Sequence, residues 1–133
     1  FYSPAHDFVN MPRATQFDTV EDYAATLLHE MTHWTGHKSR LDRKFKLTNT
    51  YSPGAKDYAK EELVAELGAA MMCCSLGITP APREDHAKYL AGWMRRLKDE
   101  PKIIFQAAAK ASKAAEFIFD AAAVQQDELQ VAA

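Results

Sequence analysis

His29-Glu30-Met31-Thr32-His33 is the stretch around which the rest of this chain is organised. On a helix, residues four apart lie one turn apart on the same face, so the two imidazoles can hold a single Zn²⁺ ion. Glu30 lies beside them, where its carboxylate can take a proton from a metal-bound water. Because paired histidines also occur on solvated helix faces, the motif needs support from the remaining sequence.

The residues around this motif predict the amphipathic helix that it requires. Thr19 is suited to cap the N-terminus, acidic residues follow in the first turn, and Gly36 is suited to end the helix. An apolar stripe recurs at three- and four-residue steps, and it consists of Val20, Tyr23, Leu27, Met31 and Trp34. We expect the stripe to lie almost opposite the histidines, so that the helix packs by one side and presents them on the other.

A second helix, predicted from about Tyr58 to Leu76, carries the best candidates for a third metal ligand. Glu62 and Glu66 lie one turn apart, opposite an apolar stripe formed by Leu63, Val64, Leu67, Met71 and Cys74. Catalytic zinc sites usually have three protein ligands, so we take Glu62 as the third. Glu66 would then hydrogen-bond the outer nitrogen of a ligand histidine. The reverse assignment stays open, as does a solvated glutamate face. Small residues such as Gly68 would let another helix approach closely.

The remaining segments predict a mainly α chain with a small β component, in the α+β class. Residues 1–12 are expected to form a short hairpin, which either aligns an extended substrate or covers the core. Residues 38–57 form a long loop, a third helix begins at Arg83, and a fourth runs from Lys102 to about Val124 before a frayed end. A single domain, 1–133, would thus contain about four helices and the hairpin.

Composition excludes several classes of function. Of the 133 residues 47% are apolar and 26% are charged, and the net charge is −2, which gives no global signal for nucleic acid or membrane. No apolar run is long enough to span a bilayer. The basic run at 38–44 is interpreted as a solvated loop rather than a binding patch. Cys73 and Cys74 are adjacent, so we expect two reduced, buried thiols in a cytoplasmic protein.

Two stretches resemble known metallopeptidases. Residues 61–66 are similar to the third-ligand helix of the gluzincins: Glu62, Ala65 and Glu66 match, whereas Glu61 replaces the asparagine that many of those enzymes carry. Over nearly the whole chain, the sequence resembles the zincin-like metallopeptidase domain of ArdC-type antirestriction proteins, which also occurs in plasmid primases. That resemblance covers residues 1–4, 7, 11–12, 23–37, 40–43, 61–68 and 85–89.

The resemblance implies a zinc-dependent peptidase that acts in antirestriction or other mobile-element biology, in the cytoplasm of a bacterium or its host. One Zn²⁺ would be held by His29, His33 and Glu62, with Glu30 as the general base and a protein or peptide as the substrate. The resemblance also implies that the chain is a C-terminal fragment. The missing N-terminal domain would bind single-stranded DNA, and we expect no nucleic-acid binding by this fragment.

A metallopeptidase also needs a donor for the oxyanion that forms during hydrolysis. His86 together with Tyr89 is the first choice for this catalytic role, and the other candidates are Tyr51, Tyr58 and His37. Each of these side chains is of a type that is more often a packing or surface residue than a catalyst. A competing hypothesis is a zincin scaffold with little catalysis that contacts a restriction or replication protein. A third, nucleic-acid binding by the basic loop, is disfavoured by the net charge.

Overall fold

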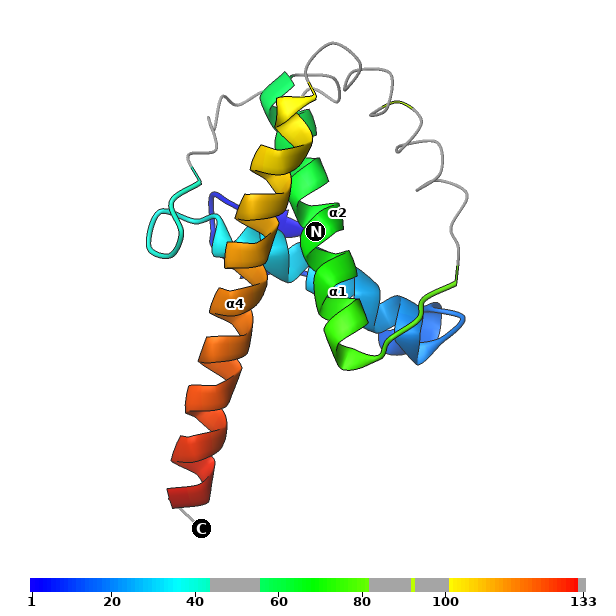
Figure 1. Ribbon diagram of the computed structural model, residues 1–133. Helices are drawn as coiled ribbons and strands as arrows, with labels where there is room; N and C mark the ends of the chain where they lie inside the picture. Colours follow the sequence, from blue (N-terminus) through cyan, green and yellow to red (C-terminus); the bar gives the residue numbers. More distant parts are fainter. Residues whose placement is uncertain (44–55, 82–91, 93–100, 132–133) are drawn as a thin grey trace.

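The computed structural model describes residues 1–43, 56–81, 92 and 101–131, which form a mainly helical chain with one small hairpin (Figure 1). In chain order, the elements are β1 (Tyr2–Ser3), β2 (Phe8–Val9), the 3-10 helix η1 (Ala14–Gln16), and the helices α1 (Val20–Thr35), α2 (Lys56–Leu76) and α4 (Lys102–Val131). The predicted α+β class is therefore confirmed. The helix expected from Arg83 and residues 44–55 of the predicted loop lie outside the described residues.

The bounds of α1 follow from its terminal residues. Thr19 caps the N-terminus as predicted, because its hydroxyl oxygen accepts a hydrogen bond from the Asp22 backbone N–H at 3.1 Å. At the other end, the Gly36 N–H donates to the His33 carbonyl at 2.9 Å, and the regular helix ends. The first turn contains Glu21 and Asp22, whose charges favour the positive end of the helix dipole.

The face that α1 buries differs from the predicted stripe. Val20 is 72% exposed, whereas Leu28, Thr32 and Thr35 are buried. The predicted stripe contained only apolar side chains, whereas the buried face of α1 includes Thr32, which lies against Gly68 of α2, and Thr35, which Arg43 contacts. The other predicted stripe residues are half-buried, and part of their cover comes from Phe17 and from α4.

Thr32 of α1 explains why α2 has a glycine at position 68. A Cβ at this position would lie 2.7 Å from Cγ2 and 2.8 Å from Oγ1 of Thr32. The Thr32 hydroxyl in turn donates to the Leu28 carbonyl at 2.8 Å, so its oxygen needs no partner from α2. The close helix approach predicted from the small residues is confirmed here.

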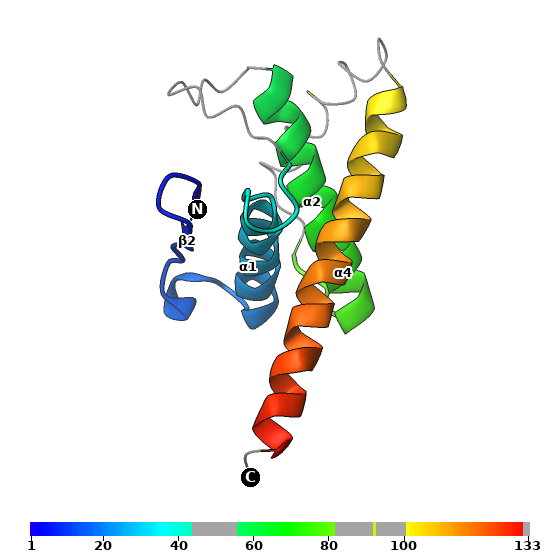
Figure 2. The same ribbon diagram turned by 90° about the vertical axis from the view of Figure 1, so that its left-hand side faces the viewer.

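α2 packs against α1 and α4, and Figure 2 shows α1 between the hairpin and the α2–α4 pair. One core cluster contains Leu28, Ala69, Met72, Cys73, Ala115 and Ile118, and the other contains Ala59, Leu63, Val64, Ala107 and Ala111. Cys73 is buried as predicted, but Cys74 is exposed. Adjacent helical residues point about 100° apart, so one face cannot bury both.

α4 continues to Val131, so the prediction of a frayed end from residue 125 is wrong. Residues 125–131 contain neither glycine nor proline, and glutamine, glutamate and leucine are good helix formers. No helix in the described ranges is long and apolar enough to cross a membrane.

The hairpin is antiparallel, with Tyr2 opposite Val9 and Ser3 opposite Phe8. Its turn contains Asp7, whose φ of 54° lies in the left-handed region that aspartate tolerates better than most residues. The strands are shorter than predicted, but they lie within the expected segment. They pack on α1, which brings the hairpin to the helix of the histidine motif.

The loop after α1 corrects the interpretation of the basic run as solvated. Lys38 is exposed, but Arg40 and Arg43 turn toward the protein. Arg40 makes two hydrogen bonds to the Asp7 carboxylate, and its guanidinium carbon lies 3.9 Å from the centroid of the Trp34 ring. This arginine therefore attaches the turn of the hairpin to the end of α1.

Candidate metal centre

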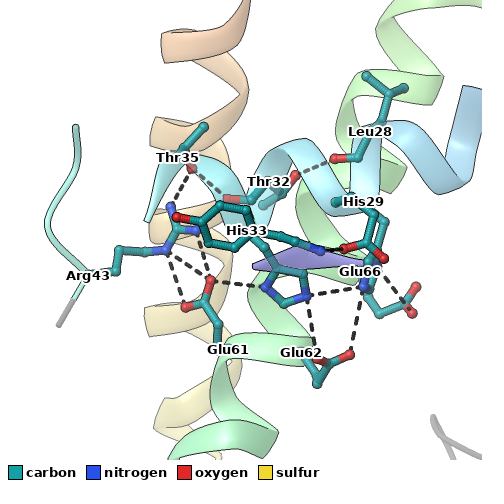
Figure 3. Close-up of polar contacts among 11 residues, drawn as sticks. Leu28, His29, Thr32, His33, Thr35, Arg43, Glu61, Glu62 and Glu66 are labelled. Atoms are coloured by element: carbon teal, nitrogen blue, oxygen red, sulfur yellow. Dashed lines mark hydrogen bonds and ion pairs between the residues drawn. The ribbon is translucent and has the colours of Figure 1, made fainter. Parts of the chain in front are cut away.

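Two helices bring three potential ligands together. His29 and His33 project from α1 toward Glu62 of α2 (Figure 3). The Nε2 atoms of the histidines are 3.2 Å apart, and the Glu62 oxygens lie 3.7 Å from Nε2 of His29 and 3.4 Å from Nε2 of His33. One ligand atom from each residue lies within 4.8 Å of the others.

The outer nitrogen of each histidine faces a further carboxylate of α2. Oε1 of Glu66 lies 3.5 Å from Nδ1 of His29, which is the placement expected from the sequence. Oε1 of Glu61 lies 3.5 Å from Nδ1 of His33, and Arg43 binds the same carboxylate. Glu61 is thus part of the site, although the sequence marks it only as a departure from the asparagine of the gluzincins. Its position next to Glu62 was the available signal.

The pKa values of the two histidines are shifted in opposite directions. Burial would lower the pKa of His33, but its contacts with Glu61 and Glu62 raise it to about 9. Burial lowers the pKa of His29, and the neighbouring His33 charge adds to this effect. Burial would raise the pKa of Glu62, but the contact with His33 lowers it on balance. A cation that binds here must therefore displace one of the two ring protons of the charged His33.

The arrangement fits a divalent metal ion. Two imidazole nitrogens and one carboxylate oxygen converge, which is a three-ligand set that leaves further coordination positions open. The outer nitrogens have carboxylates nearby, as is usual for histidines that bind metals. Both imidazole and carboxylate bind several first-row divalent ions, so the ligand types alone do not select one.

Glu30 lies beside this centre and is held by the hairpin. Its Oε2 accepts a hydrogen bond from the backbone N–H of Tyr2 at 2.7 Å. The Tyr2 hydroxyl donates to Oδ1 of Asp7 at 2.9 Å. The hydrogen bonds from Arg40 lower the pKa of Asp7 to about 2, so this carboxylate stays charged across the neutral range. The hairpin thus contributes a main-chain group to the candidate catalytic glutamate.

The structure places the predicted oxyanion donors unevenly. His86, Tyr89 and Tyr51 lie outside the described residues. His37 turns toward the loop and the hairpin, with Nδ1 at 2.8 Å from Oγ of Ser39. Tyr58 lies one turn before Glu62 on α2, and its hydrogen bond to that carboxylate helps to lower the pKa of Glu62.

The family model and the relatives that match this chain agree with one another. The sequence model of the zincin-like metallopeptidase family matches residues 1–110. The chain is 41% identical over 130 residues to a DNA primase TraC of Escherichia coli, covering 98% of this chain and 12% of the primase. It is also 40% identical over 118 residues to the uncharacterized protein y4eC of Sinorhizobium fredii, covering 89% of this chain and 37% of that protein.

Solved structures give the same result. The metal-free antirestriction protein ArdC of plasmid R388 is similar with a TM-score of 0.75 and 46% identity, over 92% of this chain and 43% of ArdC. The Mn(II)-bound form of ArdC is similar with a TM-score of 0.67 and 43% identity, over 90% of this chain and 42% of ArdC. The chain thus spans less than half of each of these relatives. The resemblance predicted from the sequence is confirmed, and the chain belongs to the family of zincin-like metallopeptidases.

Proposed function

We propose that this chain is a metal-dependent peptidase domain that hydrolyses peptide bonds. The observation that carries the proposal is the convergence of His29, His33 and Glu62 from two helices, with Glu30 beside them. Membership of the zincin-like metallopeptidase family supports it. We propose Zn²⁺ as the ion, because two imidazoles and one carboxylate are a common ligand set of catalytic zinc. The Mn(II)-bound ArdC structure makes manganese the alternative.

In the proposed mechanism, each side chain has a separate task. His29, His33 and Glu62 would hold the ion, which would supply Lewis-acid chemistry by acidifying water and polarising the scissile carbonyl. Glu30 takes the proton of the attacking water on its carboxylate and passes it to the leaving amine. The Tyr2 N–H fixes the orientation of that carboxylate through Oε2. We retain His86 and Tyr89 as the proposed oxyanion donors.

We further propose that the domain acts in plasmid antirestriction or a related mobile-element process. Its support is the similarity to the ArdC antirestriction protein of plasmid R388. A protein or peptide is the proposed substrate. Because this chain matches only part of each relative, we propose that any binding of single-stranded DNA belongs to another region of such proteins.

The second candidate function is a zincin scaffold that binds a restriction or replication protein without turnover. The observation in its favour is the hydrogen bond that Glu30 accepts from Tyr2, because an engaged carboxylate can serve structure alone. The two candidates make opposite predictions for a variant that removes the basicity of Glu30 and keeps its shape.

Glu30→Gln is that variant, and Glu21→Gln on the exposed first turn of α1 is the matched control. If Glu30 is the general base, the variant should bind metal like the wild type but lose about 10²- to 10⁴-fold in hydrolysis of denatured casein. Metal content by mass spectrometry and release of labelled peptides measure the two properties. Full hydrolysis by Glu30→Gln would contradict the mechanism, and full antirestriction by an inactive variant would favour the scaffold.

A further inference from the structure

We propose that Glu61, held by Arg43, is the positioning residue of His33: it accepts a hydrogen bond from Nδ1 and thereby presents Nε2 to the ion. This inference rests on the proposed metal site and adds a residue that the ligand set does not include. It also assigns a task to the first glutamate of the Glu61-Glu62 pair and to an arginine in the loop after α1.

The environment of His33 carries the first step. His33 is 5% exposed, and its Nδ1 has no hydrogen bond of normal geometry among the described residues. Its Nε2 faces His29 and Glu62 at 3.2 and 3.4 Å, so this nitrogen is the one available to an ion. A histidine that binds metal through Nε2 has its proton on Nδ1 and needs an acceptor there. Oε1 of Glu61, at 3.5 Å, provides one.

Arg43 fixes the acceptor. Its guanidinium donates to both oxygens of Glu61, from Nε at 3.2 Å to each and from a terminal nitrogen to Oε1 at 2.8 Å. The other terminal nitrogen donates to the Thr35 hydroxyl at 2.6 Å, and a further bond goes to the Thr32 carbonyl. One side chain thus connects the last turns of α1 to the ligand turn of α2. The carboxylate of Glu61 therefore has a fixed direction relative to His33.

The two outer glutamates are not equivalent. The side chains of His33 and Glu61 are 6% and 11% exposed, whereas those of His29 and Glu66 are 19% and 27% exposed. Hydrogen bonds between charged partners are stronger where water is excluded. We therefore expect the loss of Glu61 to weaken metal binding more than the loss of Glu66. This order is the feature that separates positioning by Glu61 from a general effect of negative charge near the ion.

The test measures Zn²⁺ and Mn²⁺ affinity of the full chain by competition with a chromophoric chelator. Glu61→Gln should lose about 10- to 100-fold in affinity, the range typical for outer partners of metal-binding histidines. Glu66→Gln should lose less, and Glu116→Gln, an exposed glutamate on α4, should match the wild type. If Glu61→Gln fails to fold because Arg43 loses its counter-charge, the double variant Arg43→Met, Glu61→Met removes both charges and should show the same loss.

A second readout reports on the ring itself. In the Zn²⁺-loaded wild type, nitrogen NMR should show the proton of His33 on Nδ1 and protected from exchange, and that protection should fall in the Glu61 variants but not in Glu116→Gln. Unchanged affinity and protection in folded Glu61 variants would overturn the inference while leaving the ligand set intact. Wild-type protein that binds no ion, or binding that survives His29→Ala and Glu62→Ala, would overturn the proposed function and this inference together.

Discussion

Replacing Gly68 by alanine tests the close approach between the two ligand helices. Two effects oppose each other. Alanine favours a helix over glycine by about 1 kcal/mol. The new Cβ, however, would lie 2.7 Å from Cγ2 and 2.8 Å from Oγ1 of buried Thr32, and both distances are shorter than real Cβ contacts. Overpacking of this kind costs about 1–3 kcal/mol, and two contacts place Gly68 in the upper part of that range.

The net expectation is a loss of about 1–2 kcal/mol in the free energy of unfolding, which is the overpacking cost minus the gain in helix propensity. Urea unfolding followed by circular dichroism measures it. With an m-value of about 2 kcal/mol per molar, the midpoint should fall by about 0.5–1 M. Because the clash pushes α2 away from α1, the affinity for Zn²⁺ should fall as well.

Gly92→Ala is the control, since a Cβ there would meet no atom of the described residues within 4 Å and should therefore cause no clash with them. Thr32→Ala removes both close atoms, so the double variant Thr32→Ala, Gly68→Ala should be more stable than the sum of the single changes predicts. A Gly68→Ala protein as stable as the wild type, with no coupling to Thr32, would refute the description of this helix contact.

Two further predictions concern the ion pairs of the loop after α1. Arg43→Met leaves the Glu61 carboxylate without its counter-charge, so the free energy of unfolding should fall by about 3–5 kcal/mol. The control Lys38→Met, at an exposed position, should change it little. A loss below about 1 kcal/mol in Arg43→Met would contradict the contribution of the buried pair. The pKa of Asp7 is lowered from 3.8 to about 2, so its contribution to stability is complete above the higher value and is lost as pH falls to the lower. Asparagine also tolerates the left-handed turn, so Asp7→Asn should keep the hairpin. In this variant the urea midpoint should decline less between pH 4 and pH 2 than in the wild type. An equally steep decline would contradict the role of the Asp7–Arg40 pair.

The sequence predicts the elements of this fold better than the faces by which they pack. The caps of α1 and the end of α2 at Leu76 are local features, and they are correct because the signals involve adjacent residues. The prediction for the buried face of α1 was wrong because it left out Thr32 and Thr35, whose side chains are polar. Each of these threonines can be buried because its hydroxyl donates a hydrogen bond to a carbonyl of the same helix. No periodicity of hydrophobic residues contains that information.

For the candidate site too, the local features could be predicted from the sequence and the contacts between distant segments could not. The histidines, Glu62 and Glu66 follow from spacing on two helices, and the structure brings all four together. The contact of Glu61 with Arg43 could not be predicted, because it joins residues 18 positions apart and no local sequence signal links them. The same holds for the hydrogen bond from Tyr2 to Glu30, which depends on where the hairpin docks.

The division of the centre between α1 and α2 has a consequence for assembly. Both nitrogen donors belong to α1 and the carboxylate donor to α2, so neither helix alone has the complete ligand set. An ion that needs both would bind the docked helix pair and not the separated segments, and its free energy of binding would add to that of docking. Metal occupancy would then indicate whether α1 and α2 are docked, and a partner that separates these helices would release the ion.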